Sequence, residues 1–212
     1  MLSGPNFRVS DISAERGRRP IFEDLSFEIS TGRITQVLGS NGSGKTTLLR
    51  ILAGLCAPEK GMVLWNNRNI YGDGRDGFLN DCVYVGHKTG ISDDATAAEN
   101  LVFFQDLHAA RAKQDYRGAL NSVGFNAPAD TLTGKVSAGQ RQRIALAKLM
   151  MVEAAMWILD EPFNALDRQG RLLIESLFVQ HCEQGGMVIL ATHQALEHNS
   201  ENIASVALAE NF

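Results

Sequence analysis

The chain has 212 residues, of which 44% are hydrophobic and 21% are charged, and this composition is that of a folded globular protein without a disordered tract. The length suits one α/β domain with a sizeable buried core. The formal net charge of −4 provides no global attraction for polyanions, so we expect no nucleic-acid partner.

Three cysteines lie far apart and form no CxxC pair, which indicates neither a disulfide framework nor a zinc site. No run reaches the roughly 18 apolar residues that a membrane-spanning helix needs. We therefore expect any role at a membrane to depend on a partner.

The N-terminal part alternates between apolar and polar residues, with turn residues between the segments. Phe7 to Ser13, Ile21 to Ile29 and Gly61 to Trp65 follow this pattern. Alternation of this kind is typical of half-buried strands, so we predict a small antiparallel sheet.

The stretch GSNGSGKT, Gly39 to Thr46, matches the GxxxxGK[ST] pattern of a phosphate-binding loop. A β-branched run that predicts a strand, Arg33 to Leu38, precedes it, and a predicted helix, Thr47 to Gly54, follows it. In such a loop the backbone N–H groups bind phosphate, the lysine reaches the outer phosphates and the hydroxyl can bind Mg²⁺. We predict a nucleotide site that includes Gly39, Ser40, Asn41, Gly42, Ser43, Gly44, Lys45, Thr46 and Thr47.

Beyond this loop, the stretch VYVGHKTG predicts a short strand that leads into a loop with one histidine, His87. Taken alone, a histidine at a strand end is more often solvated or structurally satisfied than functional. The following residues, to about Ala155, have a helical pattern. It includes a capping-box match at Thr96 to Glu99 and a helix from Tyr116 to Val123.

Three further segments carry candidate chemistry. In VSAGQ, Ser137 is a predicted N-cap, so the helix after it offers its N-terminus to an anion. The apolar run MWILD predicts a strand that ends at Asp160, in the place of an Mg²⁺ ligand, and the next residue, Glu161, can polarise an attacking water. Two exposed loop acids are the alternative, but an acid that closes a buried run is costly without a metal or partner. A third apolar strand ends at His193.

In combination, these motifs resemble those of ATP-binding cassette (ABC) ATPases. VSAGQ is similar to the LSGGQ signature, with Val and Ala at its first and third positions, NALD at Asn164 to Asp167 matches the D-loop, and His193 matches the switch histidine. The resemblance implies one α/β ABC ATP-binding domain over residues 1–212. Its parts are a mainly parallel nucleotide core (1–87 and 155–212), the N-terminal antiparallel β-subdomain and an inserted helical subdomain (about 88–154).

The resemblance also implies ATP and Mg²⁺ as cofactors and an ATP-bound homodimer with two nucleotides between its protomers. One protomer would supply the catalytic Lys45, Glu161 and His193 together with the metal-site residues Thr46 and Asp160. The other would supply Ser137, Gly139 and Gln140. Positioning and electrostatics would then carry catalysis, with Glu161 acting on water and His193 on the γ-phosphate.

Two residues depart from the family pattern. His87 stands where the Q-loop glutamine is usual, and we expect it to belong to the metal site together with Thr46 and Asp160, with a hydrogen-bonding tip on the Mg²⁺ side. Arg16 stands where an aromatic residue usually stacks on adenine, and its planar guanidinium can also stack on a base. A solvated arginine is the alternative.

Within the family, the short segments VGH, ENL, WILDEPF and THQ resemble those of the ATP-binding subunits of cytochrome c biogenesis, the haem-exporter ATPases. This resemblance implies a peripheral protein on the cytoplasmic face of the inner membrane, with an integral membrane permease subunit and a haem-handling membrane subunit. ATP hydrolysis would power haem delivery or export, or release of a haem-loaded chaperone. The alternatives are the ATPase of another small-molecule exporter, a soluble phosphate-loop kinase, and a non-transport ABC protein that acts on DNA or ribosomes.

Overall fold

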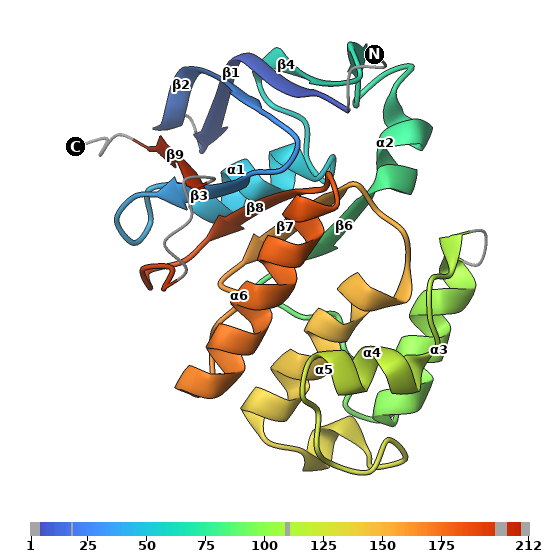
Figure 1. Ribbon diagram of the computed structural model, residues 1–212. Coiled ribbons are helices and arrows are strands. Elements are labelled where there is room, and N and C mark those ends of the chain that lie inside the picture. The colour runs from blue at the N-terminus through green and yellow to red at the C-terminus, as the bar shows by residue number, and fades with distance from the viewer. Residues whose placement is uncertain (1–4, 18, 109–110, 198–202, 209–212) are drawn as a thin grey trace.

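The computed structural model describes residues 5–17, 19–108, 111–197 and 203–208 (Figure 1). The strands are β1 (Phe7–Arg16), β2 (Arg19–Ile29), β3 (Ile34–Leu38), β4 (Lys60–Trp65), β5 (Arg68–Asn69), β6 (Cys82–Val85), β7 (Met156–Asp160), β8 (Met187–Ala191) and β9 (Ile203–Ala207). The helices are α1 (Lys45–Leu52), α2 (Arg75–Asp81), α3 (Ala97–Leu107), α4 (Tyr116–Ser122), α5 (Ala138–Met151), α6 (Arg168–Glu183) and a 3₁₀ helix at Thr133–Lys135.

The central sheet is parallel throughout and has the strand order β6-β7-β8-β3-β9. Every residue of β7 and β8 is buried. Trp157 and Leu159 pack into the cluster on the α6 side, whereas Met156 and Ile158 pack into the cluster that contains α1. Because both faces are covered, these strands are continuous apolar runs rather than alternating ones.

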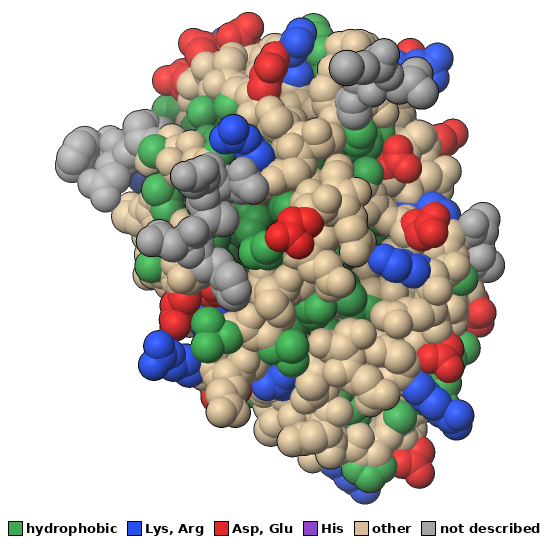
Figure 2. Space-filling model, in the orientation of Figure 1, with side chains coloured by type: hydrophobic (Ala, Val, Ile, Leu, Met, Phe, Trp, Pro, Cys, Tyr) green, Lys and Arg blue, Asp and Glu red, His purple; other side chains and the backbone are tan. Residues whose placement is uncertain are grey.

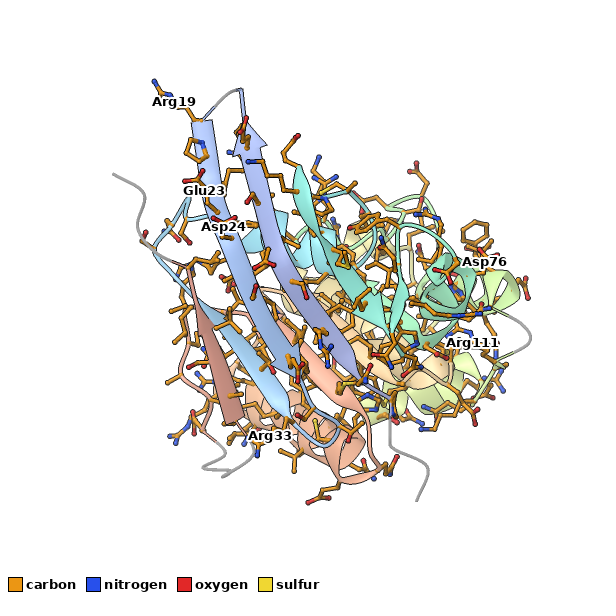
Figure 3. The ribbon with its side chains drawn as sticks, turned by 90° about the horizontal axis from the view of Figure 1, so that it is seen from above. Arg19, Glu23, Asp24, Arg33, Asp76 and Arg111 are labelled. Carbon is orange, nitrogen blue, oxygen red and sulfur yellow. The ribbon has the colours of Figure 1, made fainter. Side chains whose placement is uncertain are left out.

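The second sheet is antiparallel, with the order β2-β1-β4-β5, and it confirms the sheet predicted from the N-terminal segments. Its inner side packs on the apolar side chains of α1 and on Phe78 of α2, whose ring centroid lies 5.6 Å from that of Phe7 and 5.8 Å from that of Trp65. Figure 3 shows this sheet above the parallel sheet, with Glu23 and Asp24 on β2. Both are exposed, so the outer face of the sheet meets solvent.

Helices α3, α4 and α5 form a group below the central sheet (Figure 1). The predicted capping box is present at α3, because the Glu99 N–H donates to Thr96 Oγ1 at 3.1 Å and the Thr96 N–H donates to Glu99 Oε2 at 2.7 Å. Helix α5 runs through the middle of the group and buries Ile144 to Ala147. The exact division between core and helical subdomain stays a prediction.

The parallel arrangement decides where chemistry can occur. The carboxyl ends of β3, β6, β7 and β8 meet at one edge of the sheet, and ligands of open α/β sheets bind beyond this edge.

The molecular face in Figure 2 carries interspersed acidic and basic side chains. Within the described ranges, no helix is both long and apolar enough to cross a membrane.

Candidate nucleotide-binding site

The glycine-rich loop joins β3 to α1 and fixes the floor of the site. Gly42 and Gly44 have φ values of 83° and 100°, in the left-handed region that favours glycine. A Cβ on Gly44 would lie 2.2 Å from Ile21 Cγ2, so no larger side chain fits there. The predicted helix begins at Thr47, but α1 begins at Lys45, because Gly44 caps it. Lys45 and Thr46 therefore stand in the first helical turn, where free N–H groups favour anions.

Lys45 is a cation held inside this loop. Its side chain is buried, and Nζ donates to the carbonyl oxygens of Gly39 at 2.8 Å and Ser40 at 2.9 Å. The neighbouring Ser43 hydroxyl is also buried and has no hydrogen-bond partner in the part of the chain that the structure describes. A buried ammonium without a carboxylate partner is costly, so the loop is suited to an anionic ligand.

Asp160, at the end of β7, faces the beginning of α1. Its carboxylate is 4% exposed, and Oδ2 accepts a hydrogen bond from Thr46 Oγ1 at 2.7 Å. No described residue forms an ion pair with Asp160. A hydroxyl and a buried carboxylate form an oxygen donor set, which fits the preference of Mg²⁺ for oxygen ligands and for one or two protein carboxylates beside substrate phosphates.

Glu161 turns away from Asp160 because of its backbone. It has φ 53°, which is uncommon for a residue other than glycine, and its N–H donates to the Ala191 carbonyl at 2.9 Å. Its carboxylate Oε1 lies 3.3 Å from His193 Nε2. Two adjacent acids thus have different environments, one beside a hydroxyl and the other beside an imidazole.

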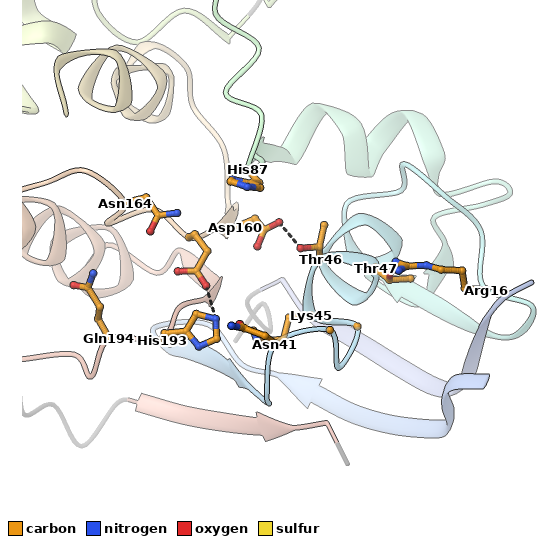
Figure 4. Close-up of a pocket in the computed structure, with 13 residues that line it drawn as sticks. Arg16, Asn41, Lys45, Thr46, Thr47, His87, Asp160, Asn164, His193 and Gln194 are labelled. Carbon is orange, nitrogen blue, oxygen red and sulfur yellow. Dashed lines mark hydrogen bonds and ion pairs between the residues drawn. The ribbon is translucent and has the colours of Figure 1, made fainter. Parts of the chain in front are cut away.

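These groups line one open cavity of about 390 Å³ (Figure 4). Arg16 lies beside Thr47 at one end of the group shown, and His193 and Gln194 lie at the other. Asn164 and Gln194 were not predicted as site residues. The lining residues are Arg16, Asn41, Gly42, Gly44, Lys45, Thr46, Thr47, His87, Asp160, Glu161, Asn164, His193 and Gln194.

The signature residues do not line this cavity. Ser137 is exposed and caps α5 as predicted, with Oγ accepting from the Gln140 N–H at 3.2 Å. Gly139 packs against the D-loop of the same chain, where a Cβ would lie 2.6 Å from the Ala165 carbonyl oxygen. Ser137, Gly139 and Gln140 are therefore not brought to the nucleotide cavity of their own protomer.

The loop that carries His87 is tied to the helical group. Lys148 of α5 donates from Nζ to the carbonyls of Thr89 at 3.0 Å and Gly90 at 3.2 Å. Burial lowers the pKa of Lys148 to about 8. His87 itself is exposed at the cavity, so this loop connects the cavity to α5.

Comparison with known proteins decides the family. The family model described as ABC transporter matches residues 22–164. The chain belongs to the ABC transporter family. It is an ATP-binding subunit of this family, and its activity is ATP hydrolysis. The match covers the phosphate loop, the signature segment and the two acids Asp160 and Glu161, whereas most of the D-loop and His193 lie beyond its end.

Its ABC relatives include a protein from Photobacterium profundum named cytochrome c biogenesis ATP-binding export protein CcmA. The two are 42% identical over 214 residues, which cover 95% of this chain and 99% of the relative. Proteins of the same name from Mannheimia succiniciproducens and Yersinia pestis are 40% and 43% identical, with 98% and 95% of this chain covered and 96% and 92% of the relatives.

Solved structures agree with the ABC ATPase fold. An ABC transporter ATP-binding protein from Pyrococcus furiosus has a TM-score of 0.80 at 22% identity, over 96% of this chain and 97% of that chain. An ATP-binding cassette solved as a dimer with ADP and phosphate has a TM-score of 0.79 at 22% identity, over 89% of this chain and 88% of that chain. At this identity the likeness concerns the fold alone, and it confirms the predicted α/β architecture.

Proposed function

We propose that this ABC ATPase powers haem delivery or export, or release of a haem-loaded chaperone, in the maturation of c-type cytochromes. The observation that carries the proposal is the 42% identity, over 95% of the chain, to a relative named for cytochrome c biogenesis and export. The alignment covers 95% of this chain and 99% of the relative. The two proteins are therefore similar over almost their whole lengths, and the similarity is not limited to an ATPase domain shared by otherwise different proteins.

The described contacts support a role for each residue in the ATP site. The loop N–H groups and Lys45 bind the outer phosphates, Glu161 orients and deprotonates the attacking water, and His193 donates to the γ-phosphate. The products are ADP and phosphate, and the water proton passes to the Glu161 carboxylate. Arg16, at the far end of the cavity, contacts the base through its guanidinium plane.

Thr46 and Asp160 are the residues that would hold Mg²⁺. When bound, the ion neutralises charge on the phosphate oxygens. Because Mg²⁺ prefers oxygen ligands, His87 would act on this part of the site through water rather than as a direct ligand.

The second half of each site would come from another copy of the chain. Support comes from the position of Ser137. It is exposed at the N-terminus of α5, where its hydroxyl caps the helix by accepting a hydrogen bond from the Gln140 N–H. A helix N-terminus binds anions, and Ser137, Gly139 and Gln140 are not among the residues that line the nucleotide cavity of their own protomer. We therefore propose a head-to-tail homodimer in which Ser137, Gly139 and Gln140 face the nucleotide of the partner.

Membrane partners would complete the transporter. Helix α3 exposes Phe103 and Leu107, at 67% and 65% of their surfaces, and large exposed apolar side chains mark surfaces for protein partners. We propose a permease-type subunit and a haem-handling subunit as these partners. The chain would then act at the cytoplasmic face of the inner membrane.

Deletion of the gene, followed by haem staining of membrane proteins, tests the proposed process. We expect c-type cytochromes with covalent haem to disappear and to return with the wild-type gene, but not with a Lys45→Ala gene of equal expression. Unchanged staining in the deletion strain would reject the haem proposal and favour an exporter of another small molecule.

The role of His87 is tested by two substitutions. Gln keeps a hydrogen-bonding tip whereas Ala removes it, so we expect His87→Gln to retain most transport-coupled ATPase activity and His87→Ala to lose it about tenfold, which corresponds to one lost hydrogen bond. The measurement is ATPase activity of the assembled transporter. If His87→Ala behaves as wild type, the histidine is a spacer in its loop.

A further inference from the structure

Several side chains of α6 contact the segment that follows His193, and Arg171 makes more of these contacts than any other. Arg171 Nη1 donates to Gln194 Oε1 at 2.9 Å, and Nη2 donates to the Ala195 carbonyl. The same guanidinium lies 3.5 Å from Glu197 Oε1. A single side chain thus contacts three of the four residues after His193.

A buried acid holds this arginine. Arg171 Nε lies 3.0 Å from Glu175 Oε1, and the two side chains are 17% and 2% exposed. The second oxygen, Glu175 Oε2, accepts from the Glu197 N–H at 2.9 Å. Glu175 therefore holds both the arginine and the far end of the segment, and charge-assisted hydrogen bonds in such a dry environment are strong and directional.

The network also reaches the loop after β7. The Arg171 guanidinium carbon lies 5.7 Å from the ring centroid of Phe163, a buried residue two positions after Glu161. In contrast, the His193 side chain is 51% exposed, and among the described residues its polar contact is the 3.3 Å pair with Glu161. Because the imidazole has little packing of its own, its position depends on the backbone that Arg171 and Glu175 hold.

We propose that Arg171 and Glu175 are positioning residues that keep His193 against Glu161 in the geometry for hydrolysis. This inference rests on the proposed roles of His193 and Glu161. The pair acts through the segment 194–197 and does not touch the nucleotide cavity, so it governs turnover rather than nucleotide affinity.

The test compares Arg171→Lys and Glu175→Gln with Arg168→Gln. Lysine keeps the charge of Arg171 but cannot make its several directional bonds at once, and glutamine keeps the volume of Glu175 but removes the ion pair. Arg168 is the matched control. Its side chain is 80% exposed and pairs with Glu197 at 3.2 Å, whereas Gln194 and Ala195 accept their hydrogen bonds from Arg171.

We expect kcat to fall about 10- to 100-fold in Arg171→Lys and Glu175→Gln, the cost of a displacement near 1 Å, with KM for ATP within about twofold of wild type. Arg168→Gln should keep both constants within about twofold. The imidazole ¹H–¹⁵N signals of His193, assigned with His193→Gln, should shift in the first two variants and not in the control.

The outcomes separate this inference from the function on which it rests. If His193→Gln turns over ATP at the wild-type rate, the proposed role of His193 fails. If His193→Gln is impaired but Arg171→Lys and Glu175→Gln are not, the positioning inference is overturned. It is also overturned if kcat falls while the His193 signals stay at their wild-type positions, because the loss of activity would then not arise from a displaced His193.

Discussion

Glu161→Gln should lower kcat for ATP hydrolysis about 10²- to 10⁴-fold, the range that a general base contributes. The amide keeps the size of the side chain and a hydrogen-bonding oxygen, but it cannot take the proton of the attacking water. ATP should still bind, since Lys45 and the loop glycines are untouched. The variant should therefore accumulate as an ATP-bound dimer.

Phosphate release and light scattering in the presence of ATP measure these two effects. Glu153→Gln is the matched control, because Glu153 is exposed and lies before β7 rather than after it. It should hydrolyse ATP as the wild type does. Wild-type turnover by Glu161→Gln would remove this carboxylate from the role of base.

Lys45→Ala should weaken ATP binding by roughly 30-fold or more, since removal of one partner of a buried charge contact costs about 2–5 kcal/mol. The reason is geometric, because the ammonium is held within the loop by two carbonyls and no described cation replaces it. Hydrolysis should be lost at ordinary ATP concentrations.

The ATP-induced rise in Tm gives the measurement, because a ligand at about 100 times its Kd stabilises the folded state by about 2.7 kcal/mol. This rise should fall to about a third or less for Lys45→Ala, because roughly 30-fold weaker binding leaves ATP at only about 3 times its Kd. It should persist for Lys60→Ala, an exposed lysine at the beginning of β4. An unchanged rise in both variants would show that ATP binds elsewhere.

Much of the core is predictable from local patterns. Strands β7 and β8 are predictable because a strand buried on both faces is an unbroken apolar run, and the phosphate loop because its glycines have fixed spacing. Helix α6 was not predicted, although Asp167 is its N-cap and accepts from the Gly170 N–H at 2.9 Å. An aspartate that precedes a helical pattern can indicate a helix N-terminus, but Asp167 is also the last residue of the D-loop motif, to which it was assigned.

The candidate site is predictable to the extent that it lies at strand ends. Lys45, Asp160 and His193 meet because parallel strands share one carboxyl edge. Asn164 lies in the turn formed by Glu161 and Ala165, which have φ values of 53° and 61°. No propensity rule places non-glycine residues in this region. The contacts of Arg171 with the segment after His193 join distant parts of the chain, and no period in the sequence indicates them.

The composite ATP site can be tested by mixing two inactive variants. Lys45→Ala damages only the phosphate-loop half. Ser137→Asp damages only the signature half, because aspartate keeps the helix cap but repels phosphate. Ser137→Asn, of the same shape without the charge, is the control and should remain active.

In a heterodimer of the two variants, one site combines the intact Lys45 of one protomer with the intact Ser137 of the other. We expect each variant alone to be inactive and an equal mixture to regain roughly a quarter of wild-type turnover, since half of randomly paired dimers contain one intact site of two. An inactive mixture, with an active Ser137→Asn control, would contradict the head-to-tail homodimer.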